Sequence, residues 1–116
     1  MGIKSDSIPR IATAFGGGFA GCGLTCGAVT GAAMAISLVH GRNNPEASRD
    51  AVNEAVRYVV DNFVKEMGTC MCRDLTGVDL RTEEGRKKQR ESGIREEVCD
   101  PAIILASRLA VEALKA

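Results

Sequence analysis

Cysteine is the residue type with the clearest capacity for chemistry in this sequence. The five cysteines fall at three places: Cys22 and Cys26 early in the chain, Cys70 and Cys72 in its middle, and Cys99 near its end. A thiolate binds soft metal ions and attacks disulfides, so clustered cysteines indicate a metal site or redox chemistry. The spacings follow no paired Cys-x-x-Cys pattern and contain no haem attachment motif. Spacing alone therefore leaves both kinds of chemistry open.

The predicted helix ends near these cysteines bear on their reactivity. Cys22 and Cys26 lie four apart at the predicted start of a helix, which would put both thiols on one face. Cys99 directly precedes Asp100 and Pro101, a cap and first-turn pair that opens another helix. Exposed amides and the helix dipole at such ends stabilise a thiolate and so lower the pKa of the thiol. The alternative is that each cysteine is buried as a small apolar residue. For Cys22 this alternative and the functional interpretation are equally favoured.

Glycine is the second unusual residue type, with 13 copies. Residues 16–18 are three consecutive glycines, and Gly27 directly follows Cys26. Backbone without side chains can approach a thiol or a ligand closely, which makes Gly17, Gly18 and Gly27 candidate cofactor-binding residues. The segment lacks the Lys-Ser/Thr ending of a phosphate-binding loop, and no strand pattern precedes it, so nucleotide binding is not indicated.

Helices must carry these residues, because no segment alternates with the period of two that is typical of strands. Apolar residues recur every three to four positions over residues 45–67, between the Asn44-Pro45 cap and Gly68. We also expect a short turn within residues 70–80 and helices over residues 7–15, 22–40 and 101–114. The charged run after Thr82 is interpreted as a solvated face. The sequence thus predicts an all-α fold: one domain over residues 1–116, a bundle of four to five helices with a glycine-rich buried helix.

Composition excludes several classes of partner. The 116 residues include 15 basic and 15 acidic side chains, so the net charge is zero and a nucleic-acid partner is not expected. Three Phe, one Tyr and no Trp leave too few aromatic rings for base stacking or for an aromatic sugar site.

An uncharged stretch from Arg10 to Arg42 raises the question of a membrane span. Residues 16–18 would break such a span near its start, and Trp and Tyr anchors are absent from the stretch, so a buried helix is the better interpretation. Without a credible export signal we expect a cytoplasmic protein with reduced thiols and no membrane partner. In that compartment clustered cysteines indicate redox or metal chemistry more often than structural bridges.

Several segments in order resemble a known family. They are GGG at residues 16–18, TCGAVTGA at residues 25–32, CRDLTGVDL at residues 72–80, and Cys99 ahead of a terminal helix. Together they closely resemble the C_GCAxxG_C_C family of redox-active proteins, and the similarity runs over residues 15–114.

The resemblance implies roles for particular cysteines. Cys26, Cys72 and Cys99 would be the family cysteines, acting as redox thiols or as metal ligands. The family's amino-terminal cysteine has no counterpart, so Cys22 or Cys70 would supply any fourth ligand. The resemblance extends to split-Soret cytochromes, which combine haem with an iron–sulfur centre. Because the haem motif is missing here, the implied cofactor is an iron–sulfur cluster or zinc, and otherwise none.

Two hypotheses of different classes follow. The first is a small cytoplasmic redox protein with an unidentified redox partner, acting through a metal or iron–sulfur electron-transfer site or through a thiol–disulfide couple. The second is a helical binding or dimerisation module with structural cysteines. The close spacing of Gly23, Gly27 and Gly31 favours tight helix pairing, so we expect a homodimer. A thiol enzyme would need a base, and His40 is the single histidine, expected instead as a helix C-terminal interaction or a nitrogen ligand.

Overall fold

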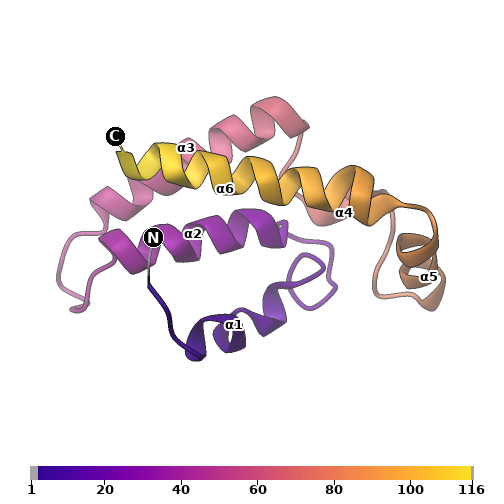
Figure 1. Ribbon diagram of the computed structural model, residues 1–116, viewed down its shortest axis with the longest axis horizontal. Coiled ribbons are helices and arrows are strands. Elements are labelled where there is room, and N and C mark those ends of the chain that lie inside the picture. Colours follow the sequence, from indigo (N-terminus) through magenta and orange to yellow (C-terminus); the bar gives the residue numbers. More distant parts are fainter. Residues whose placement is uncertain (1–2, 116) are drawn as a thin grey trace.

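The computed structural model describes residues 3–115, which form helices joined by turns (Figure 1). No strand occurs among these residues, although Thr25 and Met71 form an isolated antiparallel bridge. The predicted all-α class is therefore confirmed. In chain order the elements are α1 (Ser7–Ile11), the 3-10 turn η1 (Thr13–Phe15), α2 (Gly27–His40), α3 (Asp50–Met67), α4 (Cys72–Thr76), α5 (Glu83–Glu91), the π-helical turn η2 (Arg95–Cys99) and α6 (Asp100–Lys115).

The hydrophobic core lies where α2, α3 and α6 pack against one another. In Figure 1 the ribbon of α6 runs beside those of α2 and α3, while α1 and α5 lie at the margins. The side chains that close this core are Val29, Ala32, Ile36, Ala55, Val59, Phe63, Ala102, Leu105, Ala106, Leu109, Ala110 and Ala113. Many of them are alanines, which lets the three helices approach closely.

Helix α3 begins later and ends where the sequence indicates. The predicted start at residue 45 is wrong, because the Asn44 side chain accepts a hydrogen bond from the amide of Glu46 within a turn that stops short of the helix. The Ser48 hydroxyl then accepts from the Asp50 amide at 3.1 Å, where the helix opens. The helix ends at Gly68, whose φ of 87° lies in the left-handed region that glycine favours.

The glycine-rich segment departs most from its prediction. Every residue from 17 to 21 has a positive φ, including Phe19 at 71° and Ala20 at 53°. Gly23 also has a positive φ of 72°, so a right-handed helix cannot run through it. Helix α2 starts at Gly27, and the predicted start at residue 22 is wrong. Cys22 therefore lies in a loop and shares no helix face with Cys26.

The burial and the end of α2 also differ from expectation. Only one face of the helix is buried, through Val29, Ala32 and Ile36, whereas Gly31 and Leu38 are exposed. The helix is thus half-buried rather than fully buried. The helix ends at Gly41, whose φ of −66° lies outside the left-handed region. His40 lies exposed in the last turn.

Helix α6 covers the predicted segment but has no free amino end. The π-helical turn η2 runs directly into it, and Asp100 itself has helical angles of −64° and −46°. Cys99 therefore sits inside a continuous helical backbone. The predicted cap at Asp100 is wrong, because helical hydrogen bonding continues through it.

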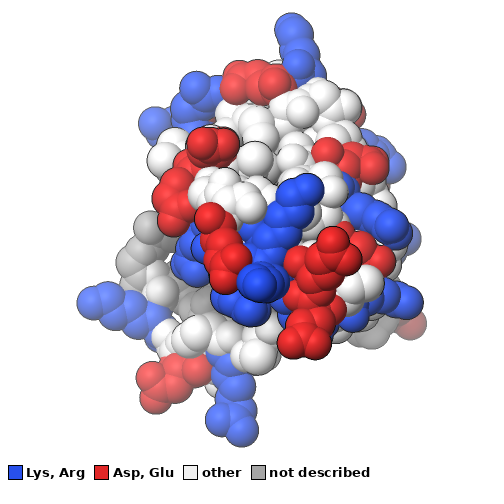
Figure 2. Space-filling view, turned by 90° about the vertical axis from the view of Figure 1, so that its right-hand side faces the viewer, with Lys and Arg blue, Asp and Glu red and all other residues white. Residues whose placement is uncertain are grey.

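The charged run forms α5. The Thr82 hydroxyl caps this helix by accepting from the Gly85 amide at 2.9 Å. Lys, Arg, Asp and Glu side chains are intermixed over the face at this end of the molecule (Figure 2), as expected for a solvated surface. Within residues 3–115, no helix is both long enough and apolar enough to span a membrane.

Candidate functional site

Two short backbone segments distant in sequence bring the first two candidate cysteines together. The Cys26 amide donates to the Cys70 carbonyl at 2.7 Å, and the Cys72 amide donates to the Leu24 carbonyl at 2.7 Å. These bonds flank the Thr25–Met71 bridge and close it as an antiparallel pair. The pairing fixes Cys26 at the start of α2 beside Cys72 at the start of α4.

The glycine loop, which comprises residues 16–21, packs directly on Cys72. A Cβ atom added at Gly18 would lie 2.6 Å from the Cβ of Cys72 and 2.6 Å from the Leu24 amide nitrogen, far closer than real side-chain contacts. Its φ of +69° independently favours glycine. Only glycine fits at this position, and its missing side chain lets the loop reach the buried cysteine.

The third candidate cysteine arrives from the other end of the chain. Cys99 ends η2, which packs against both α4 and α6. Cys26, Cys72 and Cys99 all line one open cavity of about 630 Å³. Three thiols from three separate segments therefore face the same space, together with the predicted glycines Gly17, Gly18 and Gly27.

Burial controls the acidity of two of these thiols. Burial raises the pKa of Cys72, and negative charge on Cys26 and then on Cys99 would raise it further. Burial likewise raises the pKa of Cys99, with Cys26 again the next contribution. The predicted lowering at Cys99 is therefore wrong, because that residue is desolvated and has no free helix end beside it. Negative charge on Cys26 is therefore a contribution that Cys72 and Cys99 share.

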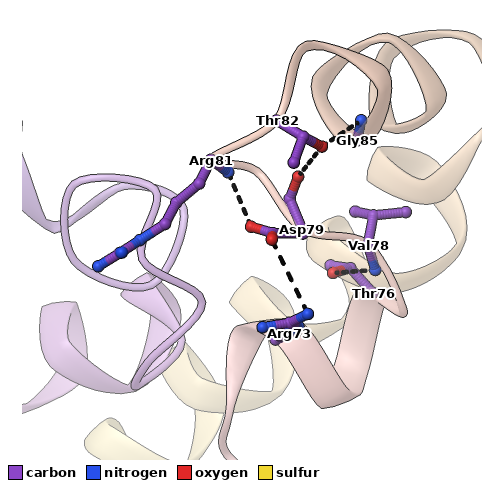
Figure 3. Close-up of polar contacts among 7 residues, drawn as sticks. All are labelled: Arg73, Thr76, Val78, Asp79, Arg81, Thr82 and Gly85. Atoms are coloured by element: carbon purple, nitrogen blue, oxygen red, sulfur yellow. Dashed lines mark hydrogen bonds and ion pairs between the residues drawn. The ribbon is translucent and has the colours of Figure 1, made fainter.

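The segment after α4 is held by polar contacts around Asp79 (Figure 3). The Asp79 carboxylate accepts from the Arg81 amide at 3.0 Å and pairs with the Arg73 guanidinium at 3.8 Å. The turn held in this way sets Leu80 against the glycine loop, where a Cβ at Gly17 would come within 3.1 Å of Leu80 Cδ1. Leu80 also lines the cavity.

The remaining two cysteines lie elsewhere. Cys22 Sγ accepts a hydrogen bond from Arg81 Nη2 at 3.2 Å, and the Arg81 side chain in Figure 3 reaches away from Asp79 toward the neighbouring loop. This hydrogen bond to Cys22 raises the pKa of Arg81. Cys70 packs against the helical core. Neither Cys22 nor Cys70 is among the residues that line the cavity, and neither is His40.

The cavity wall includes polar residues that sequence reasoning missed. Thr76, Gln89 and Ser107 line it alongside the cysteines. Gln89 lies on α5 and is half-buried, unlike the charged residues around it. Its position within the charged run, as an uncharged residue among Lys and Arg, is the one sequence signal that could have singled it out.

Within residues 3–115, no set of three or more His, Cys, Asp or Glu side chains is arranged to hold a single metal ion. All five cysteines are free thiols. The three cavity thiols are thus neighbours that share a space, without the tight convergence that one tetrahedral ion requires.

Comparison with protein families gives a match over most of the chain. Residues 1–113 match the family model C_GCAxxG_C_C, described as "Putative redox-active protein (C_GCAxxG_C_C)". No curated protein and no solved structure gives a significant match.

Proposed function

The chain belongs to the C_GCAxxG_C_C family of redox-active proteins, and from this premise we propose that Cys26, Cys72 and Cys99 form its redox site. The observation that carries the proposal is the cavity that all three line, although they come from the start of α2, the start of α4 and the end of η2. Cysteines that served only as apolar filling would not need to face an open space.

A thiol–disulfide couple is the first candidate form of this site. It is supported by the shared cavity and by the backbone hydrogen bonds that hold Cys26 beside Cys72. On oxidation, Cys26 and one neighbour lose two protons and two electrons and form a sulfur–sulfur bond, and an acceptor takes up both electrons and both protons. The third thiol can then attack that disulfide and move it within the site. We also propose a cytoplasmic location, a compartment in which free thiols are kept reduced.

An iron–sulfur cluster is the second candidate, favoured by the gathering of three thiols at one space. Cys26, Cys72 and Cys99 would hold it, with Cys22, Cys70 or a group from outside the chain as fourth ligand. Thiolates are the ligands that such clusters and zinc prefer. A cluster spreads its ligands over more than one iron and so suits wider spacing than a single zinc ion does. Bound, it would supply one-electron transfer.

Metal analysis and thiol counting separate these forms. We would purify the protein without oxygen, measure iron, sulfide and zinc, and count maleimide-reactive thiols before and after mild oxidation. The couple predicts no metal and the loss of two thiols in the wild type and in Cys70→Ser, but not in Cys26→Ser. Stoichiometric iron and sulfide, lost in Cys26→Ser, would favour the cluster instead. Five thiols that never react, in protein without metal, would refute both.

We also propose that the protein forms a homodimer. The observation in favour is the apolar surface on α6, where Ile104 is 70% exposed. Apolar exposure of this kind is typical of a contact surface. Light scattering at micromolar concentration should give twice the chain mass for the wild type and the chain mass for Ile104→Lys. A monomeric wild type would contradict the dimer and leave the redox proposal untouched.

A further inference from the structure

The cavity beside the three thiols has no charged lining. Its wall is built from glycine, alanine and larger apolar side chains, and its remaining members are the three cysteines and the uncharged Thr76, Gln89 and Ser107. Every Lys, Arg, Asp and Glu of the described chain lies outside this wall. Charged groups bound here would lose their hydration without gaining a partner, which is strongly unfavourable.

The mouth of the cavity is apolar as well. Ile103 is 52% exposed and Val111 is 47% exposed, yet both line the cavity from α6. Large exposed apolar side chains at a pocket entrance indicate a ligand that covers them. On the α5 face, by contrast, charges of both signs are mixed and give no single-signed surface to attract a charged partner (Figure 2).

The volume and the polar groups fit a small ring compound. A space of about 630 Å³ lies within the range of roughly 300–1,000 Å³ that is usual for small-molecule sites. The Gln89 amide and the Ser107 hydroxyl can each donate a hydrogen bond to a carbonyl oxygen. Thr76 is committed, since its hydroxyl already donates to the Cys72 carbonyl at 2.8 Å.

Building on the thiol–disulfide function above, we infer that this cavity binds an uncharged, largely apolar two-electron acceptor of the quinone class. Two thiols of the site give up two electrons and two protons and form one disulfide. The quinone takes up both electrons and both protons and leaves as the hydroquinone, so the exchange balances without a further reactant. Charged acceptors such as glutathione disulfide or dinucleotides do not match the wall.

The test uses tetramethyl-1,4-benzoquinone, whose ring positions are all substituted so that thiols do not add to it readily. Fully reduced protein is mixed with this quinone without oxygen, and hydroquinone formation and remaining thiols are measured together. We expect one hydroquinone for every two thiols lost. Glutathione disulfide at the same concentration should react at least about tenfold more slowly, because its charged groups resist entry.

A matched pair of variants links the reaction to the cavity. Ser107→Asp places a carboxylate on the cavity wall, and the quinone rate should fall about tenfold. Ser37→Asp makes the same change on α2 in a neighbouring apolar groove outside this wall, and the rate should be unchanged. If Ser107→Asp fails to fold by circular dichroism, Gly31→Asp repeats the test, since a Cβ there meets nothing within 4 Å.

The outcomes separate this inference from the function on which it rests. Thiols that oxidise equally well with glutathione disulfide, or a quinone rate that Ser107→Asp and Gly31→Asp leave unchanged, would overturn the quinone site but keep the thiol couple. Thiols that no oxidant removes would overturn both. A second arm offers a long-tailed quinone in phosphatidylcholine vesicles. Reaction there as well supports a membrane-held quinone, and reaction only with the free compound supports a dissolved one.

Discussion

The helical bundle and the cysteine end of the molecule are built in opposite ways. The bundle of α2, α3 and α6 has regular backbone and is stabilised by apolar burial, with Ile36 and Phe63 fully inaccessible. The glycine loop has backbone in the left-handed region, where Phe19 and Ala20 each cost about 1–2 kcal/mol. The stable part of the molecule therefore supports a locally unfavourable part, and the thiols gather at the unfavourable part.

The largest expected change in the free energy of unfolding comes from a substitution in the core of the bundle. Phe63→Ala removes a fully buried ring from the core and should lower the free energy of unfolding by about 3–5 kcal/mol. Urea unfolding followed by circular dichroism measures this. Val64→Ala, one residue along at a site that is 36% exposed, should change it far less. Equal effects would mean that α3 does not use the buried face described here.

The next effect is on the glycine loop. Gly18→Ala brings a Cβ to 2.6 Å from the Cβ of Cys72 and requires a left-handed alanine, so it should cost about 2–4 kcal/mol. Because it also displaces Cys72, the oxidation of the cavity thiols should slow. Urea unfolding and thiol counting check the two parts. A variant as stable and as quickly oxidised as the wild type would show that the loop does not pack on Cys72.

A glycine-to-alanine substitution in the bundle should instead raise the free energy of unfolding. Gly31 lies inside α2, and a Cβ added there meets nothing within 4 Å. Gly31→Ala should therefore stabilise the protein by about 0.5–1 kcal/mol through helix propensity. A higher thermal midpoint checks this. Destabilisation would mean that Gly31 contacts something on the surface of α2, and the contrast between the two regions would be weaker.

The smallest effect concerns alkaline pH. Because the pKa values of Cys72 and Cys99 are raised on folding, the native state holds these protons more firmly than the unfolded state. This contribution is complete below the ordinary thiol pKa of about 8.5 and is lost as the pH rises through the raised values. Unfolding free energy should therefore fall as the pH rises above about 8.5.

A matched variant assigns that fall to the thiols. Hydrogen bonding to Glu112 also raises the pKa of Tyr58, which acts in the same direction, so the measurement should be made in Tyr58→Phe. In that background, Cys99→Ser should flatten the alkaline decline. If the decline persists unchanged, groups other than this thiol cause it.

The sequence was a good guide to the bundle because its apolar pattern and its stop signals are local. Ala55, Val59 and Phe63 recur every fourth residue and are all buried, and the helix ends at Gly68 as expected. The resemblance also led us to expect Cys26, Cys72 and Cys99 close together, and all three line one cavity. The raised pKa values of Cys72 and Cys99 could not be predicted from the sequence, because burial depends on tertiary packing.

The cysteine end was harder for a physical reason. Five consecutive positive φ angles over residues 17–21 include Phe19 and Ala20, for which no propensity predicts a left-handed backbone. The hydrogen bond from Arg81 to Cys22 joins residues far apart in sequence, so no local pattern predicts it. The half-buried Gln89 on the cavity wall was hidden by the charged run after Thr82, which was interpreted as a solvated face.

Disulfide mapping by mass spectrometry, after oxidation of the fully reduced protein, identifies the cysteines that react together. We expect a single bridge within each chain that joins Cys26 to Cys72 or to Cys99, with Cys22 and Cys70 still free. A bridge that uses Cys22 or Cys70, or bridges only between chains, would contradict the claim that the three cavity thiols work as one redox site.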